Sequence, residues 1–473
     1  MTAAPATVAD ERAGLPTARQ VRAHLRQARR RHHDHSLGDV LGDAYVMVLF
    51  VGMYGWFAIS EARDVLHSPS MGKADPGVRW WLAVAALLAG AGLAWRGLRA
   101  LGPLLVTPAT QSWVTSAPID RRAWLAPRLG ILLAASAAGT AVLGVAVAAL
   151  SGVADLAALG WAAGAGAGWG AAALALSVVA QGSRPGRRWP ALAGAVPVLA
   201  AAVVTVLVVL VGHLGDGLPR PTGAPTAALV VLGVPLAVAA SIFAVRALPR
   251  VDRATLTTGA QFANAAATAT ILLDPSMLTG LVESRRWRRI GRVRSRRFLP
   301  GPGWWALLQA DVRRLGRHPS ALLFWAALVV VQYAAALALP GLAGAVQVVF
   351  GYLAAGRLTG GLRSISRSPG LRRALGGSDN ALRAIHVVVP AVGAGLWWLL
   401  TLPTVHGGPA WLAPALALGV VAAAYRAATR PPIDYGGATV NTPFGMVPVD
   451  LLRQGSRGPA LLAVLVLGRM LLG

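Results

Sequence analysis

The chain has 473 residues, of which 55% are hydrophobic and only 13% are charged. This composition is typical of a membrane protein, because a soluble domain could not bury so many apolar runs of about 20 residues. The absence of cysteine excludes disulfides, thiol catalysis and zinc–thiolate sites. We therefore expect an all-α fold, a polytopic transmembrane helical bundle.

The formal net charge of +26 would suggest nucleic-acid binding in a soluble protein. In this chain the arginines gather instead in alternate loops between apolar runs, as the positive-inside rule predicts. Anionic lipid headgroups would also attract arginines at that position. The pattern predicts a multi-pass protein whose N-terminus and basic loops are cytoplasmic, with anionic lipid headgroups rather than nucleic acid as a partner.

Residues 1–38 are predicted to be a cytoplasmic basic tail, and they lack the apolar core of a cleavable signal peptide. Within this tail, Val21, Leu25 and Ala28 share one face of a basic helix, which favours an amphipathic helix on the membrane surface. A tail that only fixes topology explains the same residues equally well. A first transmembrane half follows over residues 39–245, with spans expected at residues 43–60, 78–95, 129–151, 156–180, 191–212 and 225–245.

Residues 246–303 form an arginine-rich linker that we expect to be cytoplasmic, and Ser284–Arg297 alone holds eight arginines. Fixing topology and facing anionic lipid explain this charge better than a specific regulatory site does. The second half, residues 304–473, opens with a predicted amphipathic elbow helix in which Trp304, Leu308, Val312 and Leu315 share a face. Its spans are expected at residues 320–339, 341–356, 384–402 and 409–425, with a short apolar run at 459–473.

Two basic loops hold comparable positions in the two halves, at residues 96–128 and 357–383. The second carries six arginines against the single carboxylate of Asp379. Asp120 can N-cap a short helix that begins at Arg121, and Asp379 can do the same in the second loop. A capped basic helix at the membrane surface suits the transmission of force from a soluble partner. Ordinary charged loops with capped helix starts would show the same pattern.

Three glycines recur at every fourth position in the span expected at residues 156–180, namely Gly160, Gly164 and Gly168. Small residues at this spacing let a neighbouring transmembrane helix approach closely, which predicts a helix-packing face. A face that lines the path of a substrate is the alternative.

No catalytic, metal or cofactor site is expected. None of the carboxylates falls in the middle of a predicted span, which argues against proton antiport and intramembrane proteolysis. The chain has no H-E-x-x-H zinc motif, and its single lysine, Lys73, is followed by alanine where a P-loop needs serine or threonine. The chain therefore cannot be its own ATPase.

The layout of elbow helix, two spans, basic loop and further spans resembles the permease subunit of ABC-2 type exporters. Two such modules in one chain are similar to fused permeases. The tail RPPIDYGGATVNTPFG also resembles that of an actinobacterial, ABC-2-like integral membrane family without an assigned function.

The resemblance implies a non-enzymatic exporter subunit of the bacterial inner (plasma) membrane, powered by separately encoded ATP-binding subunits (ABC ATPase). Its substrate would be amphipathic or lipid-like, a peptide or a small metabolite. The positions it assigns to ATPase coupling are Pro118, Asp120, Arg121, Arg122, Arg372, Arg373, Asp379 and Arg383. The alternative is a membrane scaffold or regulatory protein that binds partners or anionic lipid through its arginine-rich linker, and a secondary transporter is a third hypothesis.

Overall fold

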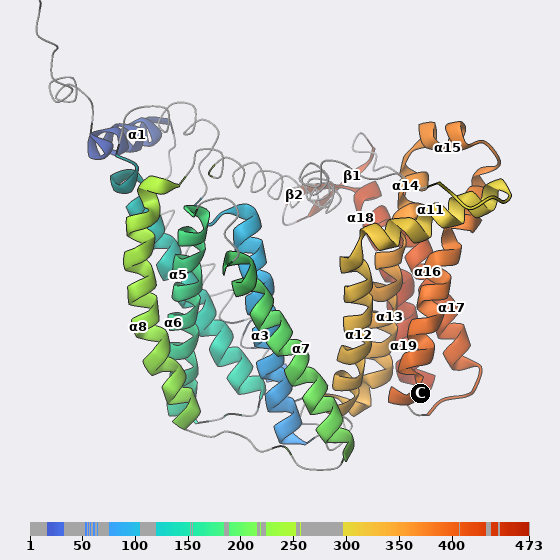
Figure 1. The fold of residues 1–473 in the computed structure, drawn as a ribbon, viewed down its shortest axis with the longest axis horizontal. Coiled ribbons are helices and arrows are strands. Elements are labelled where there is room, and N and C mark those ends of the chain that lie inside the picture. Colours follow the sequence, from blue (N-terminus) through green and yellow to red (C-terminus); the bar gives the residue numbers. More distant parts are fainter. Residues whose placement is uncertain are drawn as a thin grey trace, which may run out of the picture. The chain divides into compact units, whose positions relative to one another are not determined.

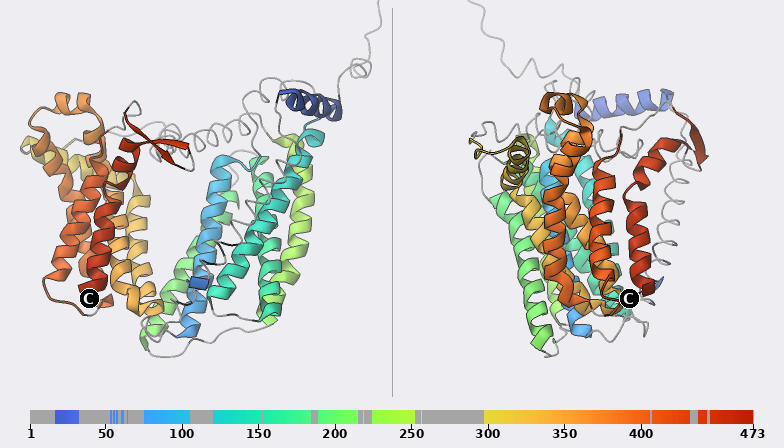
Figure 2. Two further views of the ribbon diagram at one scale, coloured as in Figure 1. Left: turned by 180° about the vertical axis from the view of Figure 1, so that it is seen from behind. Right: turned by 90° about the vertical axis from the view of Figure 1, so that its right-hand side faces the viewer.

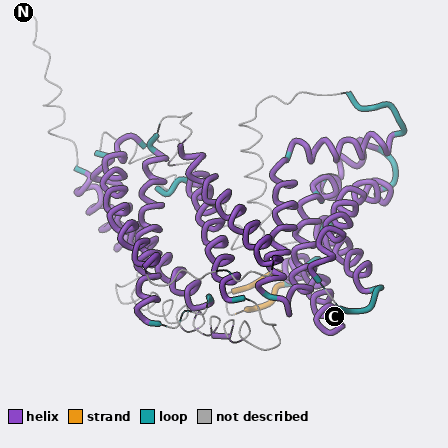
Figure 3. Tube along the Cα trace, turned by 60° about the horizontal axis from the view of Figure 1, so that its bottom comes forward, coloured by secondary structure: helices purple, strands orange, loops and turns teal. Residues whose placement is uncertain are grey.

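The computed structural model describes these parts of the chain: residues 17–32, scattered positions between 53 and 64, 75–104, 120–151, 153, 155–183, 189–214, 218, 224–251, 256, 297–405, 407–431, 437–442 and 445–472. Helix dominates the described parts (Figure 3), so the predicted all-α class is confirmed. Most of the span expected at residues 43–60 and most of the linker at residues 246–303 lie outside the described residues.

Eight helices within the described ranges are long and apolar enough to cross a membrane. They are α3 (Pro76–Leu101), α5 (Arg121–Leu150), α6 (Leu156–Gln181), α7 (Trp189–Leu214), α8 (Ala224–Ala247), α12 (Pro319–Ala338), α13 (Ala343–Leu358) and α16 (Asp379–Thr401). Two shorter apolar helices follow, α17 (Leu412–Ala428) and α19 (Pro459–Leu472). At 1.5 Å per residue α19 extends about 21 Å, less than the hydrocarbon core of about 30 Å. The protein is a multi-pass membrane protein.

The chain divides into two compact units. The first unit contains residues 1–67, 83–201 and 219–290. The second contains residues 68–82, 202–218 and 291–473, so that α3 and α7 each contribute to both units.

In the first unit α6 packs between α5 and α8. The buried cluster that joins the three helices includes Leu125 and Leu129 of α5, Val178 of α6 and Ala244 of α8. Helix α1 (Ala18–His32), which covers the predicted amphipathic segment, packs Ala18 against this cluster. The first unit therefore has an apolar core of its own.

In the second unit α12, α13, α16, α17 and α19 lie side by side (Figure 1). Trp397 of α16 is fully buried among Val348 of α13 and Val420 of α17. Four of the described helices lie at one end of this bundle, which we call the basic end (Figure 2). They are the elbow helix α11 (Gly303–Arg317), the short helices α14 (Gly360–Arg367) and α15 (Pro369–Leu375), and α18 (Val449–Ser456). The short helices η3 (Pro340–Leu342) and η4 (Leu402–Thr404) lie at the other end.

Two buried glutamine side chains hold the second bundle together near η4. Gln332 Nε2 of α12 donates to Ala343 O at 3.0 Å and to Thr404 Oγ1 at 3.1 Å. Gln347 Nε2 of α13 donates to Thr401 Oγ1 of α16 at 3.1 Å. Buried amides need such partners, because an unpaired polar group in an apolar interior costs several kcal/mol.

The segment between α17 and α18 contains a hairpin that the sequence did not indicate. Strand β1 (Thr439–Thr442) pairs antiparallel with β2 (Gly445–Pro448), and Val440 lies opposite Val447. The hairpin leads directly into α18, which begins at the residue after β2. The N–H of Val449, the first residue of α18, donates to Ala438 O at 2.9 Å.

Candidate functional site

The basic stretch at residues 357–383, expected to be a loop, is folded into two short helices. Helix α14 follows α13 almost without a break. It buries Leu362 and Ile365, which share one face because they are three residues apart. Helix α15 begins after Ser368, whose Oγ accepts from the N–H of Leu371 at 3.2 Å. The stretch is therefore an ordered part of the basic end.

Arg372 holds this part together. Its Nη1 donates to the carbonyl oxygens of Ile365 and Ser366 at 2.9 Å each, at the C-terminal end of α14, where carbonyl groups have no helical partner. Its Nε lies 3.0 Å from Asp379 Oδ2, at the first turn of α16. Arg383 Nη2 is 3.9 Å from the same carboxylate oxygen. Three of the eight predicted coupling residues thus form one ion-paired cluster.

The prediction that Asp379 N-caps the following helix is wrong. Ser378 is the N-cap, and its Oγ accepts from the N–H of Ala381 at 3.2 Å. Asp379 is the first helical residue, which leaves its carboxylate free to turn back toward Arg372. An acidic side chain at this position also favours the positive end of the helix dipole.

In the first predicted coupling loop, residues 96–128, the predicted N-cap at Asp120 is confirmed. Asp120 is the N-cap of α5, and its Oδ1 accepts from the N–H of Arg122 at 2.9 Å. The expected short surface helix is wrong, because α5 runs without interruption from Arg121 to Leu150. Arg121 Nη1 donates to Val251 O at 3.3 Å, Arg122 is exposed, and Pro118 lies outside the described residues.

Helix α15 presents an apolar pair to solvent. Leu371 and Leu375 lie one turn apart on this helix, and their exposed fractions are 39% and 43%. Arg373, another predicted coupling residue, is exposed beside them. The two leucines and Arg373 thus form a small, mixed apolar and basic face on α15.

A buried carboxylate–imidazole pair joins the elbow helix to α16. The Nδ1 of His386 donates to Asp311 Oδ2 at 2.5 Å, and the two side chains are only 6% and 8% exposed. Nε2 of His386 is buried and has no hydrogen-bond partner in the described part of the chain. Separation of α11 from α16 would leave a buried polar side chain without its partner, which is costly. The pair therefore fixes α11 against the bundle.

Helix α14 closes over the same pair. Gly361 lies so near the Asp311 side chain that an added Cβ would stand 2.5 Å from its Cγ. Its neighbour Gly360 approaches Arg314 of α11, with 3.4 Å between an added Cβ and the guanidinium Nε. The absence of side chains at these two glycines lets α11, α14 and α16 meet at one point.

The local sequence pattern does not predict the point where α11, α14 and α16 meet. The apolar face predicted for α11 is largely on the outside, since Trp304 and Val312 are exposed, whereas the polar Gln309 and Asp311 are buried. The signal that could have revealed it is His386, which recurs with Leu382 and Pro390 on the buried face of α16. A histidine in an otherwise apolar stripe requires a polar partner.

The glycine series of α6 is a packing face over part of its length. An added Cβ at Gly168 would lie 2.8 Å from the backbone of Gly233 in α8, and one at Gly164 would only touch Val230 at 3.4 Å. One at Gly160 would meet no atom within 4 Å. The predicted close approach therefore occurs at Gly168.

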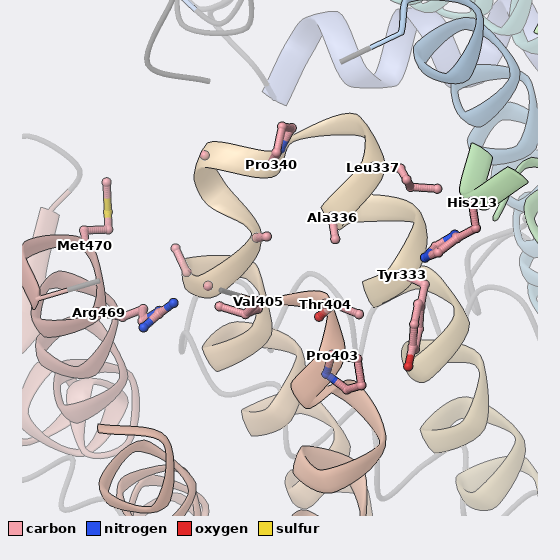
Figure 4. A pocket seen from close by; sticks show the side chains of 14 residues that line it. His213, Tyr333, Ala336, Leu337, Pro340, Pro403, Thr404, Val405, Arg469 and Met470 are labelled. Atoms are coloured by element: carbon pink, nitrogen blue, oxygen red, sulfur yellow. The ribbon is translucent and has the colours of Figure 1, made fainter. Parts of the chain in front are cut away.

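A cavity of about 510 Å³ opens near η3 and η4 of the second unit. Most of the residues that line it are apolar, and Figure 4 shows the guanidinium of Arg469 and the ring of His213 on opposite sides of it. Arg469 is 8% exposed, and its Nη1 donates to Gly407 O at 3.3 Å. The described residues that line the cavity include no aspartate or glutamate. The cavity thus combines apolar walls with positive charge.

These features define the class of protein as a multi-pass helical membrane protein with an ordered basic surface at one end of its second unit. Residues 72–438 match the family described as a family of unknown function (DUF6297), and the chain belongs to this family. No curated protein and no solved structure matches the chain. Among the described residues no cluster of three or more histidine, aspartate or glutamate side chains could hold a metal ion.

Proposed function

We propose that this protein is the permease subunit of an ABC-2-like exporter, powered by separately encoded ATP-binding subunits. The observation that carries the proposal is the Arg372 cluster, which ties the end of α14 to the start of the α16 span. A partner that pushes on α15 would move α16 through this cluster rather than deform a loose loop.

The exposed face of α15 is the surface that we assign to the ATPase. Leu371 and Leu375 would enter an apolar groove of the partner, and Arg373 would meet an acidic rim. In this proposal the coupling role extends to three residues behind that face, Arg372, Asp379 and Arg383. They would not contact the ATPase directly but would hold α15 in a fixed position relative to α16.

We place the protein in the bacterial plasma membrane, with its N-terminus and basic end in the cytoplasm. The arginines of the basic end and of the linker support this orientation through the positive-inside rule. The substrate that we propose is amphipathic or lipid-like. The apolar cavity beside Arg469 supports that class, because it could take an apolar chain that carries a negative group.

The test is purification from native membranes in a mild detergent, followed by mass spectrometry of the proteins that accompany the chain. We expect a Walker-motif ATPase to co-purify with the wild type. The variant Leu371→Asp with Leu375→Asp should lose it, whereas Val449→Asp, an exposed change on α18 at the same end, should retain it. Absence of any ATPase from the wild-type preparation would reject the proposal in favour of a scaffold.

A further inference from the structure

A second cavity, of about 560 Å³, lies at the basic end of the second unit, where α17 ends and α19 begins. Three arginines line it: Arg426 in the last turn of α17, Arg453 of α18, and Arg457 just after α18. Among the described residues that line it there is no aspartate or glutamate. So concentrated a positive lining predicts an anionic ligand.

The arginines are held around the cavity by close packing of the backbone. Gly458, at the turn between α18 and α19, is buried, and an added Cβ would lie 2.8 Å from Ala427 Cβ and 3.1 Å from the hydroxyl of Tyr352. Arg430 Nη2 donates to Gly455 O at 3.2 Å, which ties the end of α17 to α18. The cavity is therefore a built feature of the fold.

The three guanidinium groups are available to a ligand. Within the described part of the chain, the side chains of Arg426, Arg453 and Arg457 make no hydrogen bond or ion pair. A guanidinium presents five N–H donors in a planar fork, which matches the oxygens of a phosphate. Because three arginines line one cavity, a phosphate, which offers more oxygen acceptors than the two of a carboxylate, fits this lining best.

Gln454 adds a second, different requirement. It lines the same cavity, is only 8% exposed, and its Oε1 is buried without a hydrogen-bond partner among the described residues. Its Nε2 is already used, since it donates to Asp450 Oδ1 at 3.3 Å. An amide oxygen accepts hydrogen bonds, so the ligand should carry a donor such as a hydroxyl group.

We propose that this cavity binds a hydroxyl-bearing phosphate ester, with the phosphate on the three arginines and a hydroxyl on Gln454 Oε1. The chemistry is that of a phosphatidylglycerol-type lipid headgroup or of a soluble polyol phosphate. The site flanks two apolar helices, which is where a headgroup would lie. This proposal does not depend on the exporter function.

The experiment uses the full-length protein in detergent micelles, titrated by calorimetry with dioctanoyl phosphatidylglycerol. We expect the wild type to bind, and the variant Arg453→Gln with Arg457→Gln to bind at least about tenfold more weakly. The matched control is Arg367→Gln with Arg373→Gln, two exposed arginines of the basic end outside the cavity. Equal binding by the cavity variant and the control, or no binding by the wild type, would overturn the proposal.

A second pair of titrations tests Gln454. Dioctanoyl phosphatidylmethanol has the same phosphate charge without headgroup hydroxyls, and the wild type should prefer phosphatidylglycerol by about fivefold, the factor that one net hydrogen bond contributes. Gln454→Leu should abolish this preference while it keeps affinity for phosphatidylmethanol. A wild type that binds both lipids equally would overturn the assignment of Gln454.

Glycerol 3-phosphate and inorganic phosphate distinguish the two sources of the ligand. If glycerol 3-phosphate binds at least about tenfold more weakly than the lipid, the physiological ligand is a lipid headgroup, because the acyl chains then contribute to affinity. If it binds as tightly as the lipid and inorganic phosphate does not, the ligand is a soluble phosphate ester. Both results retain the site, whereas equal binding of inorganic phosphate would overturn the hydroxyl requirement.

Discussion

His386 Nδ1 and Asp311 Oδ2 lie 2.5 Å apart and join α16 to the elbow helix α11 across 75 positions of the chain. Both side chains are buried, and Gly361 of α14 packs on the same carboxylate. Any tilt of α16 must therefore displace α11 and α14 as well, or break this hydrogen bond. The pair therefore couples α11, α14 and the first half of α16.

Removal of one partner of the pair should be costly. We expect Asp311→Ala to lower the free energy of unfolding by about 3–5 kcal/mol, because the change leaves an imidazole buried without its partner. The measurement is equilibrium unfolding in detergent micelles. Asp311→Ala combined with His386→Leu should lose less than Asp311→Ala alone, since both polar groups are then gone. Strict additivity of the two changes would show that the pair is not coupled.

A second prediction concerns the contact between α14 and α11. Gly361→Ala should destabilise the protein by about 1–3 kcal/mol, because the new methyl group overlaps the Asp311 side chain. Gly356→Ala in α13 is the matched control, since an added Cβ there meets no atom within 4 Å. The control should be neutral or stabilising, as alanine is the better helix former by about 1 kcal/mol. The measurement is the melting temperature of each variant in thermal unfolding. Equal melting temperatures of Gly361→Ala and Gly356→Ala would contradict the close contact between α14 and α11.

A third prediction uses the glycines of α6. Gly168→Ala should weaken the association of α6 with α8 by about 1–3 kcal/mol, because the backbone of Gly233 occupies the space. Gly160→Ala, on the same helix in open surroundings, should leave stability unchanged or raise it. Both can be followed by thermal unfolding in micelles. A larger loss at Gly160 than at Gly168 would show that the packing face is misplaced.

The assignment of the N-cap of α16 can be tested through its dependence on salt. Ser378→Ala should cost about 1 kcal/mol at any ionic strength, because it removes a hydrogen bond to the N–H of Ala381. Asp379→Asn should cost at most about 1 kcal/mol, and this loss should shrink in 1 M salt because the carboxylate is half exposed. Free energies of unfolding measured at low and at high salt distinguish the lost hydrogen bond of Ser378→Ala from the lost ion pair of Asp379→Asn. A salt-sensitive loss for Ser378→Ala would contradict the assignment.

The class of fold was predictable from the sequence because a bilayer demands long apolar helices. The span expected at residues 156–180 corresponds closely to α6, and both segments expected to be amphipathic are helical. The span expected at residues 129–151 lies within α5 except for its last residue, although α5 begins earlier, at Arg121. The cap at Asp120 was also predicted correctly. These features depend on neighbouring residues alone, so a local pattern can reveal them.

The basic end was predicted less well because its structure depends on contacts between distant residues. The run of arginines from 357 to 383 suggested a charged loop, but Leu362 and Ile365 are buried and make α14 a packed helix. Ser378 and Asp379 were equally good capping residues by type, and the position of Arg372 decides between their roles. The partner of His386 lies 75 residues earlier, beyond the reach of any local pattern.

The buried amide of Gln332 has a consequence for the order in which the second unit is assembled. One of its hydrogen bonds goes to Ala343 O, which follows closely in the chain, but the other goes to Thr404 Oγ1 in η4, just beyond the end of α16. During synthesis α12 reaches the membrane before Thr404 exists. The two-helix intermediate of α12 and α13 must therefore keep one amide hydrogen in water or on another group until α16 arrives. Insertion of α16 supplies the missing partner and fixes α12 and α13 in position. We therefore expect a chain truncated before residue 404 to integrate less stably into the membrane and to be degraded faster by proteases than the full-length chain.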